Sequence, residues 1–196
     1  MKIRQYLWII AAGAALAACQ QGARQEGTGE DSVFQANTLQ APFTDEYYDS
    51  LKTTMTAYYQ LSNALVKGDT LAADIAAAAL KYHVDSLPVG RLGIDSSRAA
   101  ALAVSTGNIS AELSGLIIDK GGLDSRRSSF QMVSDQLYDL LQTTGFKGNT
   151  VYRQHCPMAF GNRGAHWLSD TTEVVNPYFG DEMLHCGSVT DTLHFQ

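Results

Sequence analysis

The sequence predicts a mainly α fold, an antiparallel four-helix bundle followed by a short, loop-rich C-terminal segment that contains small strands. Three observations lead to this prediction. Apolar residues recur with a period near 3.6 through four stretches between residues 44 and 145, short loops separate these stretches, and the helical pattern stops after Gly148. With 196 residues, 45% of them hydrophobic, the chain is long enough for one core, so we expect one folded domain over residues 42–196.

The first two helices are predicted between Thr44 and Pro88. Thr44 suits the N-cap position, acidic residues fill the first turn, and Gly68 ends the first helix. Asp69 or Thr70 can cap the second helix. This helix must end before Pro88, because proline has no amide proton to donate and disfavours a helical residue before it.

The third and fourth helices are predicted on either side of the glycine pair at 121–122. We expect the third helix to start at 95–96 and to stop at this pair, with Gly107 and Gly115 weakening it internally. The fourth helix is expected to start at 124–125 and to end before Gly145.

Short strands are predicted at 150–152 and 165–168, in the C-terminal segment 149–196. A turn at 161–164 separates them, and a second turn is expected at 176–180 because Asn, Pro and Gly favour tight turns.

The N-terminus is typical of a bacterial lipoprotein. Residues 1–18 read as a signal peptide, with a cationic start and an apolar run too short for a permanent membrane span. Leu16-Ala17-Ala18-Cys19 resembles a lipobox, in which the cysteine is lipidated and becomes the first residue of the mature chain. A plain secretion signal is the alternative interpretation.

The stretch 19–41 is polar and glycine-rich without an apolar period, which predicts a flexible tether with a reach on the order of 25 Å. The alternative is that Val33, Phe34 and Leu39 dock this stretch onto the domain.

Charge and cysteine content narrow the function classes. Removal of residues 1–18 leaves 12 cations and 20 acids, which gives a net charge of about −8. Binding to nucleic acid requires a basic surface, so we do not expect nucleic acid as a partner. If Cys19 carries lipid, Cys156 and Cys186 are the two remaining thiols, in a compartment where disulfides can form.

Two sulfur pairs in the C-terminal segment predict a soft-metal site. A cysteine and a methionine stand close together at each end of a thirty-residue interval, and thiolate and thioether sulfur select Cu(I) and similar ions. Spacing suggests that an extended segment puts the first pair on one face and that a helical turn does so for the second. The predicted ligands are Cys156, Met158, Met183 and Cys186.

Weaker candidates for the same site are His155, His166, His185 and Trp167. Strand alternation should aim His155 away from Cys156, and a lone histidine is more often structural than a ligand. The Trp167 ring could cap a soft cation through its face, although a core or rim position is the commoner role of such a ring.

A disulfide between Cys156 and Cys186 is the main alternative to the metal site. On a chain-entropy estimate, closing a loop of this length stabilises the fold by about 3–4 kcal/mol without any metal. Met158 and Met183 would then fill gaps in the core.

No enzymatic activity is expected. The sequence contains no Cys-x-x-Cys, no His-Glu-x-x-His and no phosphate-binding glycine loop, and His155 beside Cys156 is not a catalytic dyad by adjacency.

The C-terminal segment resembles a known family. CysProMetAla, GlyAla-x-TrpLeuSer, AsnProTyr-x-Gly and MetLeu-x-CysGly occur in order within 152–187, and the helix at 124–137 has the matching Arg-x-x-Phe and Ser-x-x-Leu pattern. This combination is similar to the bacterial domain-of-unknown-function family 3347, closely over 124–193 and diffusely before that.

The resemblance implies a metal-handling protein. The family occurs as periplasmic lipoproteins and as domains fused to adaptor subunits of copper and silver efflux systems. We therefore expect a lipid-anchored protein on the periplasmic side of the outer membrane that binds a copper or silver ion for sequestration or for delivery to an efflux adaptor. The competing expectation is an interaction module, without metal, whose tail is fixed by the Cys156 to Cys186 disulfide. A redox sensor that switches between these states is a third, weaker possibility.

Overall fold

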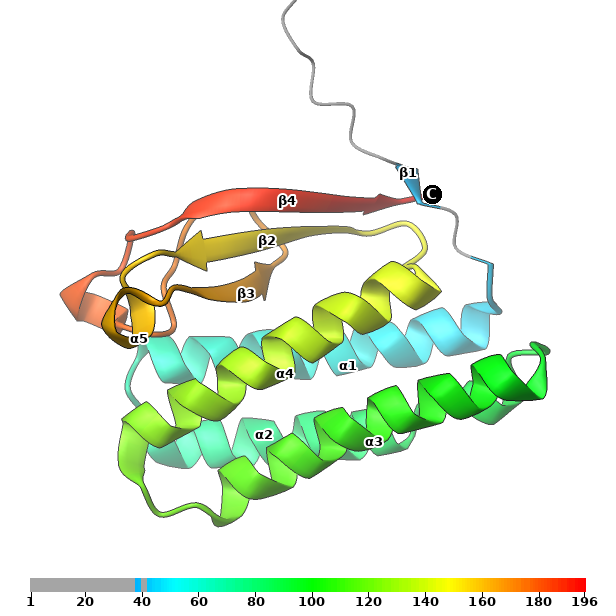
Figure 1. Ribbon diagram of the computed structural model, residues 1–196, viewed down its shortest axis with the longest axis horizontal. Helices are drawn as coiled ribbons and strands as arrows, with labels where there is room; N and C mark the ends of the chain where they lie inside the picture. Colours follow the sequence, from blue (N-terminus) through cyan, green and yellow to red (C-terminus); the bar gives the residue numbers. More distant parts are fainter. Residues whose placement is uncertain (1–37, 40–41) are drawn as a thin grey trace, which may run out of the picture. The chain divides into compact units, whose positions relative to one another are not determined.

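Four long helices and a small C-terminal sheet make up the part of the chain that the computed structural model describes, residues 38–39 and 42–196 (Figure 1). The mainly helical class with short C-terminal strands is thereby confirmed. The predicted signal peptide, the lipidation site Cys19 and most of the predicted tether lie outside the described residues.

Helices α1 (Asp45–Val66) and α2 (Thr70–Asp85) begin where their predicted caps stand. The Thr44 side chain accepts a hydrogen bond from the Tyr47 amide at 3.4 Å, and Asp69 accepts one from the Ala72 amide at 2.9 Å. These bonds satisfy amide groups that have no partner within the helix. The α2 helix ends before Pro88, and the short helix η1 (Val89–Arg91) follows.

Helices α3 (Ser96–Ile118) and α4 (Gly122–Thr144) complete the helical part. Asp95 caps α3 as predicted, and Gly107 and Gly115 do not interrupt it. The prediction that α4 begins at 124–125 was wrong by two to three residues. Gly122 has a φ of 82°, a value that glycine adopts without steric cost, so the chain reverses there and the helix starts at once.

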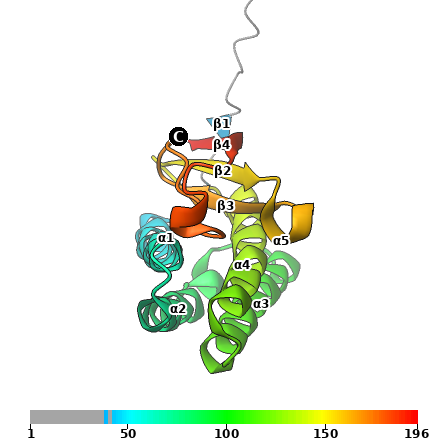
Figure 2. The ribbon, with the colours of Figure 1, turned by 90° about the vertical axis from the view of Figure 1, so that its left-hand side faces the viewer.

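The elements form successive layers when the domain is viewed end on (Figure 2). The sheet lies on α1 and α4, and α2 and α3 lie on the other side of these two helices. Helix α3 is long and apolar enough to cross a membrane, but core helices of other proteins meet the same criteria. In its most apolar stretch of 18 residues, 28% of the residues are buried in the domain.

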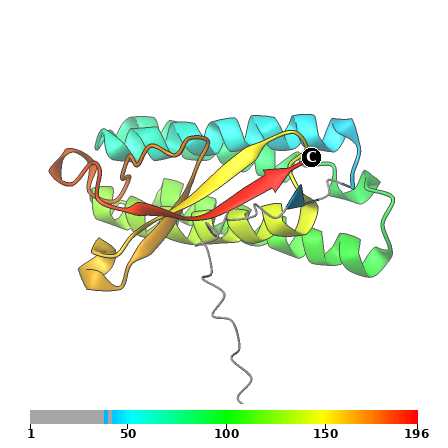
Figure 3. The same cartoon turned by 90° about the horizontal axis from the view of Figure 1, so that it is seen from above.

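The sheet consists of β4–β2–β3 in antiparallel order, with the two-residue β1 (Thr38–Leu39) added in parallel to β4. Strands β2 (Thr150–Cys156) and β3 (Ala165–Ser169) confirm the predicted pair. Strand β4 (Ser188–Phe195) was not predicted, because its first five residues are exposed or half-buried and carry no apolar alternation. Figure 3 shows β2 and β4 running across the helices.

Tyr58 ties the sheet to the helices. Its fully buried hydroxyl oxygen accepts a hydrogen bond from the Leu168 amide of β3 at 2.9 Å and lies 2.8 Å from the Ser134 Oγ of α4. Arg153 of β2 also pairs with Asp135 of α4, at 2.8 Å. These contacts fix the position of β2 and thereby of the candidate site at its end.

Candidate metal centre

The structure brings the two predicted thiols together at the end of β2. Cys156 is the last residue of β2 and is fully buried, whereas Cys186 lies just before β4 and is half-buried. Their Sγ atoms are 3.3 Å apart, and both residues are free thiols. The pair therefore has one side in the protein interior and one side open to an incoming ion or oxidant.

Two glycines allow this approach of separate chain segments. A Cβ at Gly187 would lie 2.8 Å from the His155 carbonyl oxygen and 3.0 Å from the Trp167 ring, so only glycine lets the Cys186 segment lie this close to β2. At Gly164, where φ is 78°, a Cβ would lie 2.4 Å from the His155 side chain. Close backbone packing thus explains both glycines next to the sulfur motifs.

Asn176 holds the segment that carries Cys186. Its buried side chain donates to the Cys186 carbonyl at 2.8 Å and accepts from the Tyr178 amide at 2.8 Å. The backbone amide of Asn176 donates to the Leu184 carbonyl at 2.8 Å. The sequence indicated a turn at 176–180, which is confirmed, but the role of this side chain in positioning Cys186 was missed. Asparagine before proline is the signal for such a side-chain-stabilised turn.

Buried Gln154 holds the loop that follows β3 against the sheet. Its amide nitrogen donates to the carbonyls of Thr171 and Glu173 at 3.0 and 2.9 Å. The loop that leads from β3 to Asn176 therefore covers the face of β2 that carries Cys156.

The two methionines do not have the backbone geometry that their spacing suggested. Met158 is in the right-handed helical region with φ −89° and ψ −12°, because β2 ends at Cys156 and a turn follows; its residue is 45% exposed. Met183 has φ −148° and ψ 51°, outside the helical region, and its carbonyl accepts from the Cys186 amide at 2.9 Å. Met158 therefore does not lie in an extended segment and Met183 does not lie in a helical turn; the two methionines lie in the loops that flank the thiols.

The weaker candidates separate into different environments. His155 and His166 pair across β2 and β3 with ring centroids 4.4 Å apart, and because neighbours on a strand face opposite sides, this histidine pair lies on the other face of β2 from Cys156. His185 is exposed, with its Nδ1 2.8 Å from the Val174 carbonyl oxygen. Trp167 is 1% exposed, a core position.

Because of His166 in the histidine pair, we expect the stability of the fold to depend on pH. Burial, then the charge of Arg153, then His155 lower the pKa of His166 below 6.5. Between that lowered value and 6.5 the unfolded chain binds a proton that the folded chain excludes, so the free energy of unfolding should fall as pH drops below 6.5. Urea denaturation at a series of pH values measures this.

The variant His166→Asn should flatten the pH dependence, whereas His83→Asn, on α2 and away from the sheet, should leave it unchanged. An equal pH dependence in His166→Asn and in the original chain would contradict the expectation.

The donor set of the thiol pair restricts the metals that it fits. Within 38–39 and 42–196, no three His, Cys, Asp or Glu side chains are grouped so that they could hold a metal ion. Structural zinc takes four such ligands, which this site does not supply. Soft monovalent ions accept two or three sulfur ligands, so a thiol pair with thioethers nearby fits Cu(I) or Ag(I) better.

The thiols also couple any binding to pH. The hydrogen bond with Cys156 is the main cause that raises the pKa of Cys186, with burial and the charge of a Cys156 thiolate adding to it. A metal must displace these protons, so binding should strengthen as pH rises.

The model of the family described as "Protein of unknown function (DUF3347)" matches residues 54–149 of the chain. No characterised protein and no solved structure matches the chain. The matched range ends just before β2, whereas the sequence resemblance was expected to be closest over 124–193. Cys156 and Cys186 therefore lie outside the matched range, and their role is argued from the geometry.

Proposed function

The chain belongs to the DUF3347 family, and from that premise we propose that it binds a soft metal ion, Cu(I) or Ag(I), through Cys156 and Cys186. The observation that carries this proposal is the 3.3 Å separation of the two Sγ atoms, from cysteines thirty residues apart.

The geometry accommodates one ion between the thiols after a small movement. With metal–sulfur bonds of about 2.3 Å, two sulfurs on one ion at tetrahedral or trigonal angles lie roughly 3.8–4.0 Å apart. The Sγ atoms would separate by about 0.5–0.7 Å to reach this arrangement from 3.3 Å. Rotation of the half-buried Cys186 side chain can supply this shift while its backbone stays bonded to Asn176, and Cys156 is held at the end of β2.

Further ligands come from the flanking loops. Met158 is exposed and Met183 is half-buried, so either thioether can turn toward the thiols by side-chain rotation. In this proposal the cysteines are the principal ligands and the methionines complete the coordination.

The proposal includes a cellular setting. The lipobox at Cys19 supports a lipid anchor on the periplasmic side of the outer membrane, and 19–41 supports a tether. There the protein would sequester the ion or deliver it to the adaptor of a heavy-metal efflux system. Catalysis is not part of the proposal.

We also propose that the four long helices form an antiparallel bundle. The packing of α1 on α2, α2 on α3 and α3 on α4, all joined by short loops, supports this arrangement.

A titration with Cu(I) against a competing chelator tests the metal site. The full chain with Cys19→Ser, reduced, leaves Cys156 and Cys186 as the thiols. Tight binding of one ion is expected, with a loss of roughly 100-fold or more in affinity in Cys156→Ser, because a thiolate ligand is replaced by a hydroxyl that the soft ion does not prefer.

The methionines have a matched control within the chain. Met158→Leu and Met183→Leu should each weaken binding, whereas Met132→Leu, 48% exposed on α4, should not. If the reduced chain binds Cu(I) no more tightly than an unrelated dithiol peptide, the metal site is wrong.

A second candidate function rests on the same pair of thiols. Oxidation to a disulfide requires the Sγ atoms to approach from 3.3 Å to about 2.05 Å, and an export compartment permits it. The protein would then be an interaction module with a rigid tail. Counting free thiols by mass after alkylation of the native protein distinguishes the two: no free thiol supports the module, and two support the metal site.

A further inference from the structure

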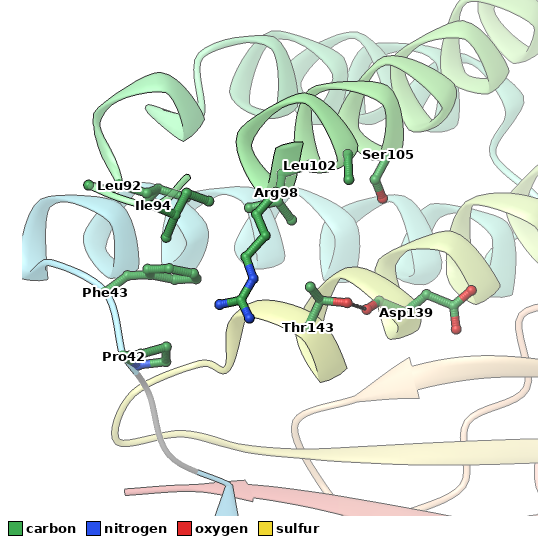
Figure 4. A pocket seen from close by; sticks show the side chains of 11 residues that line it. Pro42, Phe43, Leu92, Ile94, Arg98, Leu102, Ser105, Asp139 and Thr143 are labelled. Carbon is green, nitrogen blue, oxygen red and sulfur yellow. Dashed lines mark hydrogen bonds between the residues drawn. The ribbon is translucent and has the colours of Figure 1, made fainter. Parts of the chain in front are cut away.

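A cavity of about 640 Å³ lies where α3 begins and α4 ends, at the opposite end of these helices from the turn that connects them (Figure 4). Three segments line it besides α4: the residues before α1, the loop after η1, and the first turns of α3. The volume falls within the range of about 300–1,000 Å³ typical of small-molecule sites. The thiol pair is not among its lining residues.

Most of the lining is apolar. Pro42 and Phe43 form one wall, Leu92 and Ile94 a second, and Leu102 a third. Such a lining favours a hydrocarbon or aromatic group, which gains free energy when it leaves water.

The wall formed by Phe43 is held in place before any ligand arrives. The Phe43 amide donates to the Tyr48 hydroxyl at 3.2 Å, and that hydroxyl donates to the Thr144 carbonyl at 2.7 Å. The Phe43 ring also packs edge-on against Tyr47, with centroids 5.4 Å apart. A wall that is already ordered loses little entropy on binding.

Arg98 is the cation of the cavity, and its base is anchored. One carboxylate oxygen of Asp95 accepts from the Arg98 backbone amide at 3.0 Å, and the other lies 3.4 Å from the Arg98 Nε. Within the described chain, the two terminal guanidinium nitrogens have no hydrogen-bond partner. Figure 4 shows the guanidinium extending between Phe43 and Thr143.

Asp139 is the second charged residue of the lining, and its negative charge limits the ligand to one anionic group. Figure 4 shows the Asp139 carboxylate on the far side of Thr143 from the guanidinium. A further anionic group at that end would be repelled, whereas a carboxylate at the Arg98 end can accept two parallel hydrogen bonds from the free nitrogens.

We infer that this cavity binds a small monocarboxylate with an apolar body, its carboxylate on Arg98 and its body against Phe43, Ile94 and Leu102. The site is separate from the thiol pair and does not depend on the proposed metal binding.

Calorimetric titration of the full chain carrying Cys19→Ser with decanoate, below its micelle concentration, tests this site. Decanol is the matched probe, because it has the same chain without the charge. Decanoate should bind saturably at one site and roughly 2- to 5-fold more tightly than decanol, because the guanidinium is largely exposed and its contact with the carboxylate is screened by water.

Three variants locate the binding. Arg98→Gln should remove the preference for decanoate, and Ala101→Phe, which adds a ring at an exposed lining position, should weaken both probes. Arg91→Gln removes an equally exposed arginine that pairs with Glu46 outside the cavity, and should bind like the original chain.

Unfolding temperatures confirm that each variant is folded. Equal affinities for decanoate and decanol, an unchanged preference in Arg98→Gln, or the absence of saturable binding would each overturn the inference.

Discussion

Replacement of Trp167 by alanine is expected to lower the free energy of unfolding by about 3–5 kcal/mol. The side chain is 1% exposed and packs edge-on against Tyr178, with ring centroids 5.8 Å apart. Truncation would remove this buried area and leave a cavity between β3 and the loop that carries Cys186. Urea denaturation measures the change.

The matched comparison is Leu71→Ala, in which the same kind of truncation is made at a position that is 69% exposed on α2. It should change the free energy of unfolding by no more than about 0.5 kcal/mol. Trp167→Phe should fall between the two, since part of the ring volume is kept. A loss below about 1 kcal/mol in Trp167→Ala would show that the loop does not pack on the ring as described.

Replacement of Asn176 by alanine is expected to cost about 2–4 kcal/mol, because the Cys186 carbonyl and the Tyr178 amide both lose their partner. Both groups lie in buried or partly buried positions, where an unpaired polar group is costly. Denaturation and the Cu(I) titration together measure the effect.

Asn176→Asp separates the two hydrogen bonds. The carboxylate still accepts from the Tyr178 amide but turns an oxygen instead of a donor toward the Cys186 carbonyl, so metal affinity should fall as in Asn176→Ala. Asn149→Ala is the matched control, because that side chain donates at 2.7 Å from an exposed position. If Asn176→Ala is as stable as Asn149→Ala, Asn176 does not hold the loop.

The helices were predictable because their signals are local. Thr44, Asp69 and Asp95 each bond an amide three residues ahead, and an apolar period of 3.6 marks the buried face of each helix. The start of α4 was the exception, since nothing in the sequence before it shows the positive φ at Gly122.

The C-terminal segment was predictable only in part. The two strands predicted at 150–152 and 165–168 have turn residues between them, and the structure has them at 150–156 and 165–169. Strand β4 was missed because its edge residues are polar and its pairing with β2 is not a local property. The backbone conformations expected at Met158 and Met183 were wrong for a similar reason. Both residues lie in turns, where the periodicity of a strand or a helix does not apply.

The sequence by itself determined the helical class, the caps, and the presence of two cysteines and two methionines in one segment, because these depend on residue type and near neighbours. Only the tertiary structure decided that Cys156 and Cys186 meet at 3.3 Å and that His155 pairs with His166 across β2 and β3. The two thiols meet because Gly187 lets its segment lie close to β2 and because Asn176 bonds backbone groups on both sides of its loop. These contacts join residues far apart in the sequence, so no local sequence pattern predicts the distance between the two Sγ atoms.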